Sequence, residues 1–98
     1  MEKAETAALL ATISGRVQGV WFRGFVVENA RKLGVTGWVR NRANGTVEAE
    51  LVGSGPAINE LLRRCRKGPS AARVDGIDVR PMAAPDPAPT DFVQRPTE

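Results

Sequence analysis

An alternating pattern of apolar and polar residues recurs along the chain, and each occurrence predicts a β-strand. Every second residue of such a segment faces the same side of the extended chain, so the apolar set indicates the buried face. The sequence Asn44-Gly45 is a hairpin turn signal between the second and third segments, and Gly76 marks either a bulge in the fourth segment or its start. Residues 91–95 can add a short strand at an edge of the sheet. The four predicted strands cover residues 9–14, 35–41, 46–52 and 77–80.

Two other segments repeat their apolar residues at the spacing of an α-helix with one buried stripe. The first runs from about Phe22 to Leu33, and Gly34 follows where a helix cap would stand. The second begins near Pro56, which suits the first turn of a helix, and it ends before Gly68. The basic residues in the last turn of this second helix fit the negative end of the helix dipole.

The order of these elements predicts the fold. Strand, helix, strand, strand, helix, strand (βαββαβ) is the split βαβ arrangement of a ferredoxin-like α+β sandwich, in which two helices cover one face of an antiparallel sheet. With 98 residues, of which 42% are hydrophobic, the chain is expected to form a single domain, 1–98, around one core. We expect a flexible N-terminal segment, 1–6, and a proline-rich loop, 81–90.

The composition excludes several kinds of chemistry. The sequence contains no histidine and a single cysteine, Cys65, which excludes a histidine–cysteine zinc cluster, an intramolecular disulfide and a cysteine–histidine pair. Cys65 belongs to the apolar stripe of the second helix, and this favours a place in the core. We expect no metal and no cofactor. The 14 basic and 11 acidic residues give a net charge of +3, which favours small anionic ligands.

The chain carries no signal of a membrane protein. It has no apolar run of about 18 residues, and its first residues lack the apolar core and the small-residue cleavage pattern of a leader peptide. We therefore expect a cytoplasmic protein without a membrane partner. Nothing in the sequence demands more than a monomer.

The predicted topology brings three distant segments to one end of the sandwich. The first helix starts where the first strand ends and runs back along the sheet, so the second strand returns to the same end. The loop 15–20, Arg23 in the first helical turn and Asn41 at the end of the second strand therefore converge. By strand parity Asn41 shares a face with Val35 and Val39, so its amide is expected to point toward the helices.

Each of these segments offers groups that bind a phosphoryl group. The start of a helix leaves backbone N–H groups free, and Gly15 and Gly19 allow the preceding loop to curl around an anion. Arg23 adds a planar cation that can hold two phosphate oxygens, and Asn41 can accept a hydrogen bond from a water while donating another. Taken singly, the glycines, Arg23 and Asn41 would indicate an ordinary turn and ordinary surface contacts; together they favour a phosphate site.

Two stretches of the chain resemble the signature motifs of the acylphosphatase family. The first reads GRVQGVWFR at residues 15–23, and the second reads GWVRNRANGTVE at residues 37–48. The resemblance covers essentially the whole chain, and the two motifs together are specific. Asn44 stands where the family commonly has aspartate, and Trp21 fills a position that a smaller aromatic residue often takes. Neither departure removes a catalytic group.

The resemblance implies an acylphosphatase (EC 3.6.1.7), which hydrolyses the carboxyl–phosphate bond of acyl phosphates to a carboxylate and inorganic phosphate by metal-free in-line attack of water. It implies that Arg23 binds the phosphate and that Asn41 positions the attacking water. The backbone amides expected to surround the phosphoryl oxygens belong to Arg16, Val17, Gln18, Gly19 and Val20.

Two other functions stay open on the sequence alone. A phosphate-binding or regulatory module that retains the phosphate cradle would keep the same motifs, and an acylphosphatase-like module of this kind occurs within the hydrogenase-maturation carbamoyltransferases. An RNA-binding domain shares the order of strands and helices. However, the first and third predicted strands lack the paired aromatic residues with which such domains stack bases, so we expect no nucleic-acid partner.

Overall fold

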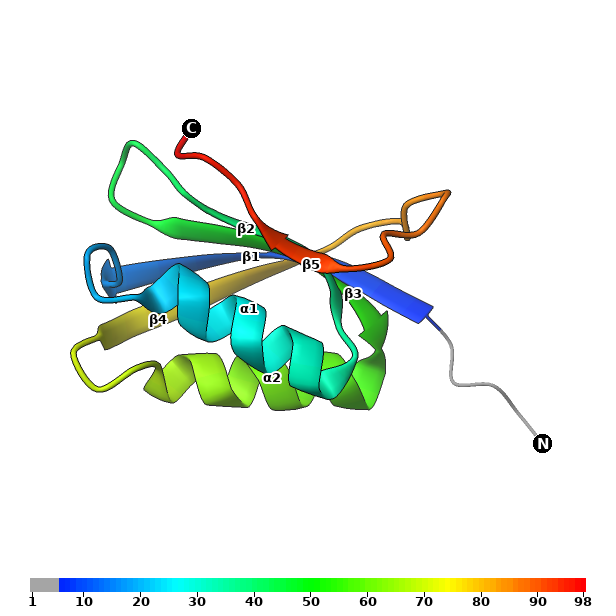
Figure 1. Ribbon diagram of the computed structural model, residues 1–98, viewed down its shortest axis with the longest axis horizontal. Helices are drawn as coiled ribbons and strands as arrows, with labels where there is room; N and C mark the ends of the chain where they lie inside the picture. Colours follow the sequence, from blue (N-terminus) through cyan, green and yellow to red (C-terminus); the bar gives the residue numbers. More distant parts are fainter. Residues whose placement is uncertain (1–5) are drawn as a thin grey trace.

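The computed structural model describes residues 6–98, and this part of the chain forms five strands and two helices in the predicted order (Figure 1). The segment expected to be flexible, 1–6, lies outside the described residues except for Thr6, which belongs to the first strand and pairs with Ser54. The elements are β1 (Thr6–Arg16), α1 (Phe22–Leu33), β2 (Thr36–Asn41), β3 (Val47–Ser54), α2 (Gly55–Lys67), β4 (Arg73–Pro81) and β5 (Phe92–Gln94).

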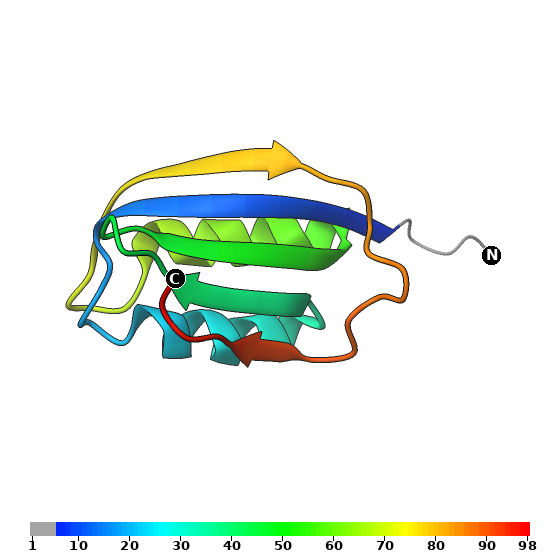
Figure 2. The ribbon, with the colours of Figure 1, turned by 90° about the horizontal axis from the view of Figure 1, so that it is seen from above.

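The strands form one sheet in the order β4-β1-β3-β2-β5. The first four pair in antiparallel fashion, which confirms the predicted ferredoxin-like sandwich. The short edge strand β5, whose direction the sequence did not predict, lies parallel to β2. The reason is the path of the chain after β4. Residues 82–91 cross the end of the sheet at which β4 finishes, so β5 starts at that end and must run in the same direction as β2 (Figure 2).

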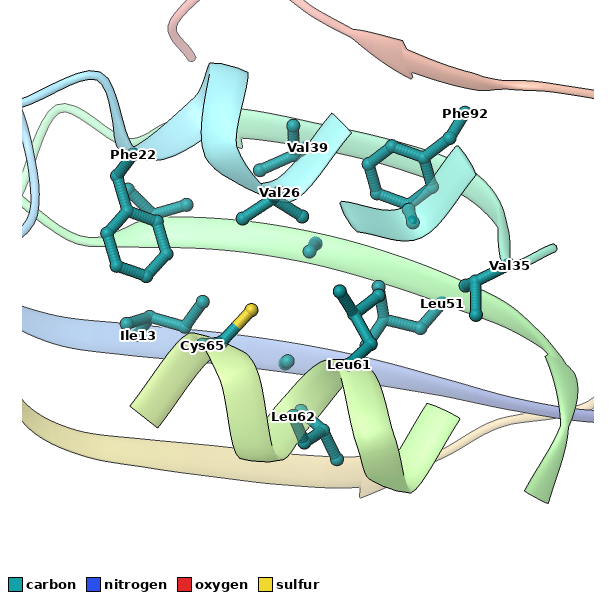
Figure 3. Packing of buried hydrophobic residues seen from close by; sticks show 14 of the residues in the cluster. Ile13, Phe22, Val26, Val35, Val39, Leu51, Leu61, Leu62, Cys65 and Phe92 are labelled. Atoms are coloured by element: carbon teal, nitrogen blue, oxygen red, sulfur yellow. The ribbon is translucent and has the colours of Figure 1, made fainter. Parts of the chain in front are cut away.

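Both helices pack on one face of the sheet and bury apolar residues of β1, β2, β3 and β5, whereas Val74 and Ile77 of β4 are partly buried at the edge of the core (Figures 1 and 3). Phe92 of the short strand β5 is fully buried there, which anchors the edge of the sheet under α1. Cys65 lies in the same core on α2, as its place in the apolar stripe predicted. The largest fully buried side chains are Phe22, Phe92, Ile13, Leu51, Ile58 and Leu61.

A bulge bends the pairing of β1 with β4 next to the loop that leads into α1. The register shifts between Ser14, which pairs with Gly76, and Gly15, which pairs with Val74. Of the two roles considered for Gly76, the bulge is therefore confirmed. Gly15 has a φ of 122°, and a Cβ at this position would overlap the carbonyl group of Arg73. Only glycine lets the two strands approach so closely here.

The other face of the sheet is not covered by helices and carries a network of charged side chains. The carboxylate of Glu48 accepts hydrogen bonds from Arg40 at 2.8 Å and from Arg42 at 3.0 Å. Burial alone raises the pKa of Glu48, but the two arginines outweigh it and hold the pKa below its ordinary value of 4.5. The network fixes the last residues of β2 against β3.

No helix in residues 6–98 is long and apolar enough to cross a lipid bilayer.

Candidate active site

A pocket of 120 Å³ opens at the end of the sandwich where β1 and β2 finish and α1 begins. Figures 1 and 2 show the loop between β1 and α1 and the hairpin between β2 and β3 at this same end. The convergence of distant segments that the topology predicted is therefore present. The walls of the pocket consist of Val17, Gly19, Trp21, Phe22, Arg23, Gly24, Asn41 and Gln94.

Arg23 lies in the first turn of α1, and its side chain is partly buried at the pocket. Within the described part of the chain its guanidinium forms no ion pair and no side-chain hydrogen bond. By contrast, two arginines near the end of β2, Arg40 and Arg42, both bind Glu48. A half-buried cation without a counter-ion loses hydration without compensation, so the site favours the entry of an anion.

Asn41 ends β2, and its side chain points into the layer between the sheet and the helices. Val35, Gly37 and Val39 have the same parity and are buried, which bears out the expected direction of the Asn41 amide. Its Oδ1 atom is buried and has no hydrogen-bond partner among residues 6–98. Buried polar atoms are almost always paired in folded proteins, so this acceptor is poised to bind a water or another donor in the pocket.

The first turn of α1 presents free backbone donors to the pocket. Trp21 precedes the helix in the left-handed conformation, with φ 64°, and no side chain caps the exposed N–H groups of the first turn. The first turn also contains no acidic residue, so the positive end of the helix dipole is not neutralised. The strain of a left-handed tryptophan, about 1–2 kcal/mol, is retained at the mouth of this site.

The loop between β1 and α1 is tied to the neighbouring hairpin by one side chain. Gln18 Nε2 donates hydrogen bonds to the carbonyl oxygens of Arg42, at 2.8 Å, and of Thr46, at 3.0 Å. These two carbonyls flank the turn at Asn44-Gly45, directly after Asn41. Gln18 thus holds the loop and the end of β2 in a fixed relation, which the motif alone did not reveal.

The predicted site residues divide into two groups in the structure. The pocket walls include Val17, Gly19, Arg23 and Asn41. The remaining three lie outside the walls. Arg16 is the exposed last residue of β1, the Gln18 side chain turns to the hairpin, and the Val20 side chain packs against the core.

Four wall residues were not predicted: Trp21, Phe22, Gly24 and Gln94. The first three accompany Arg23 at the pocket because they lie in or beside the first helical turn. Gln94 comes from β5, whose parallel course beside β2 carries it to this end of the sheet. The only signal for it was the possible edge strand at 91–95, which gave no indication of direction.

The arrangement can hold a small anion together with a water. The 120 Å³ of the pocket is well above the space of about 10–15 Å³ that a single water needs. Cys65 takes no part, because burial raises the pKa of its thiol to about 12 and leaves it without nucleophilic thiolate at neutral pH. Among residues 6–98, no three aspartate, glutamate, histidine or cysteine side chains gather into a cluster that could hold a metal ion.

Known proteins resemble this chain both in sequence and in structure. The chain matches the family model described as acylphosphatase over residues 9–93. It is 55% identical over 89 residues to the acylphosphatase of Rhodospirillum rubrum, a match that covers 91% of this chain and 96% of that protein. The structure of an acylphosphatase from Coxiella burnetii has a TM-score of 0.88 at 33% identity and covers 97% of this chain and 100% of its own.

A second kind of relative contains the same fold as a small part of a larger chain. Full-length HypF in a phosphate- and nucleotide-bound form has a TM-score of 0.88 at 28% identity, and the match covers 98% of this chain but 13% of HypF. By contrast, the match to the acylphosphatases extends over nearly all of both chains. The fold, the two motifs and the extent of these matches lead to one conclusion: this chain belongs to the acylphosphatase family.

Proposed function

We propose that the pocket formed by Arg23, Asn41 and the start of α1 is the site at which this acylphosphatase hydrolyses acyl phosphates. The observation that carries the proposal is that two groups in one pocket lack partners among the described residues: the Arg23 guanidinium and the buried Oδ1 of Asn41. A phosphoryl group satisfies the first and an attacking water satisfies the second. Neither requirement would arise if the residues served only the fold.

In the proposed reaction, Arg23 and the backbone N–H groups of the loop 16–20 and of the first turn of α1 hold the equatorial phosphoryl oxygens. Asn41 Oδ1 accepts a hydrogen bond from the water and directs its oxygen toward phosphorus. The new P–O bond forms to water, the bond to the acyl oxygen breaks, and its electron pair leaves on the carboxylate. The water protons end on inorganic phosphate and solvent.

The absence of histidine from the sequence is compatible with this chemistry. A carboxylate is a stable leaving group and needs no general acid to protonate it. The catalytic groups therefore act by positioning and by stabilising charge, which arginine and backbone amides provide without a metal ion. We propose a metal-independent enzyme that acts as a cytoplasmic monomer.

A phosphate-binding module without turnover is the second candidate, since the same fold also occurs as a small part of HypF, a larger protein seen in a phosphate- and nucleotide-bound form. Such a module would keep Arg23 and the loop but would have no need for an unpartnered acceptor at Asn41. RNA binding has less support. Trp38, on the open face of the sheet, is flanked by the guanidinium groups of Arg40 at 4.7 Å and Arg95 at 4.8 Å from its ring centre, so it is not free to stack a base.

The test is phosphate release from an aromatic acyl phosphate by purified protein in excess chelator. We expect turnover by the wild type and a loss of at least about 10²–10³ fold in Arg23→Ala, the cost of removing one preorganised charged contact. Arg80→Ala is the matched control, because Arg80 is an exposed arginine on β4, away from the pocket, and should retain full activity. Near-normal turnover by folded Arg23→Ala would refute its role, and no turnover by folded wild type would favour the binding module.

A further inference from the structure

One side chain of β5, Gln94, reaches the phosphate pocket from the edge of the sheet. Its partner in the parallel pairing of β5 with β2 is Val39, so both side chains lie on the face that the helices cover. Asn41 follows two residues later on β2 and has the same parity. Figure 2 shows β5 running toward the end at which α1 begins. Gln94 therefore lies beside Asn41 in the wall of the 120 Å³ pocket.

The side-chain amide of Gln94 does not hold the fold together. Within residues 6–98 this amide makes no hydrogen bond, and the residue is exposed. By contrast, the other glutamine of the chain, Gln18, donates two hydrogen bonds to the hairpin between β2 and β3. An amide carries both a donor and an acceptor, so the Gln94 side chain can bind a ligand that enters the pocket.

The pocket has a buried side and an open side. Val17 and Phe22 are each 1% exposed and form its inner wall, and the unpartnered Oδ1 atom of Asn41 is buried as well. Trp21 and Gln94 are exposed and form its mouth. A water that the Asn41 oxygen holds therefore approaches the phosphoryl group from the inner side.

The geometry of phosphoryl transfer then determines where the leaving group lies. The attacking and leaving oxygens are roughly in line, on opposite sides of phosphorus. With the water on the inner side, the acyl oxygen points to the mouth, where Gln94 offers an N–H donor. Negative charge grows on the departing carboxylate as its bond to phosphorus breaks. A donor already in place there stabilises the transition state more than the bound substrate.

We propose that Gln94 donates a hydrogen bond from Nε2 to the leaving carboxylate of the acyl phosphate. The proposal rests on the proposed function, because Arg23 and Asn41 must hold the phosphoryl group and the water for the acyl oxygen to face the mouth. The electron pair of the breaking P–O bond stays on the acyl oxygen, and Gln94 keeps its proton throughout. Gln94 thus assists the departure of the carboxylate without acting as a general acid.

The experiment compares wild type with Gln94→Met, which keeps the length of the side chain and removes the amide. It measures kcat/KM for a series of para-substituted benzoyl phosphates, because their leaving carboxylates differ in pKa while the reacting end keeps its shape. For the unsubstituted compound we expect kcat/KM to fall about tenfold, the contribution of one hydrogen bond to an oxygen that is gaining charge. The loss should grow with the pKa of the leaving carboxylic acid, because a poorer leaving group depends more on the donor.

Inhibition by inorganic phosphate shows whether Gln94 acts on the leaving group. Phosphate carries no acyl group, so its inhibition constant should change by no more than about threefold in Gln94→Met, less than kcat/KM does. Asn59→Met is the matched control. Asn59 is an exposed amide on α2, away from the pocket, and its replacement should leave every one of these values unchanged.

Three results would overturn the assignment of Gln94 while leaving the phosphate site intact: unchanged kcat/KM in Gln94→Met, a loss that does not grow with the pKa of the leaving acid, or an equal loss of phosphate affinity. No hydrolysis of any benzoyl phosphate by folded wild type would overturn the proposed function and this assignment with it. If Gln94→Met does not fold, Gln94→Glu gives the same test, because its carboxylate has the same shape and cannot donate at neutral pH.

Discussion

Replacement of Asn41 by alanine separates a catalytic role from a structural one. The side chain makes no hydrogen bond within residues 6–98, and its Oδ1 is buried without a partner, so Asn41→Ala removes an unsatisfied acceptor rather than a bond. Removing such an atom relieves a desolvation cost of about 1–3 kcal/mol and loses some packing, so we expect the free energy of unfolding to change by no more than about 1 kcal/mol. The variant should therefore be well folded.

The same change should strongly reduce turnover. Loss of one oriented group that acts in the chemical step costs about 10²–10³ fold in kcat, whereas loss of a neutral hydrogen bond to bound phosphate, about 0.5–1.5 kcal/mol, weakens phosphate binding by about tenfold at most. The assay measures kcat with an aromatic acyl phosphate and the inhibition constant of inorganic phosphate. Urea unfolding gives the stability of each protein.

The control for this variant is Asn59→Ala, an exposed asparagine on α2, which should behave as wild type in all three measurements. An equal loss in kcat and in phosphate affinity would indicate a simple binding contact. A destabilisation of several kcal/mol would mean that Asn41 has a structural partner, and the reasoning from its unpaired oxygen would be refuted.

Two further predictions concern the residues that hold the site in place. Gln18→Ala should lower kcat/KM by about tenfold and the free energy of unfolding by about 1–2 kcal/mol, because two hydrogen bonds to the hairpin are lost. The control is Asn29→Ala, which loses two hydrogen bonds outside the pocket. In the same kinetic and urea measurements it should lose stability but keep kcat/KM. Glu48→Gln should lower the free energy of unfolding by about 2 kcal/mol at pH 7. The pKa of Glu48 in the folded protein lies below 4.5, so this difference between wild type and variant is present above pH 4.5 and shrinks as the pH falls through the folded pKa. A difference in unfolding free energy between wild type and Glu48→Gln that does not change with pH would contradict this prediction.

The candidate site could be predicted largely because its main residues follow from local rules. Arg23 is placed by the start of the helix, and Asn41 is placed by strand parity and by the return of β2 to the end where β1 finishes. Both rules act over a few residues or one strand–helix–strand unit, where the chain has little freedom. The roles of these residues nevertheless came from the family motif and await the experiments above.

Other features depend on contacts that no local pattern specifies. The direction of β5 follows from the course of residues 82–91, a proline-rich loop with no periodicity, so neither the parallel edge nor the arrival of Gln94 at the pocket was predictable. Gln18 could not be assigned to the hairpin, because its two acceptors are 24 and 28 residues away.

The most direct test of the central claim is a titration of ¹⁵N-labelled protein with inorganic phosphate, followed by amide and side-chain NMR shifts. We predict that the largest changes occur at the backbone amides of residues 16–24 and at the side-chain amide of Asn41, and that they are lost in Arg23→Ala. Changes centred instead on the basic residues at the end of α2, Arg63 to Lys67, would place the anion elsewhere and contradict the account.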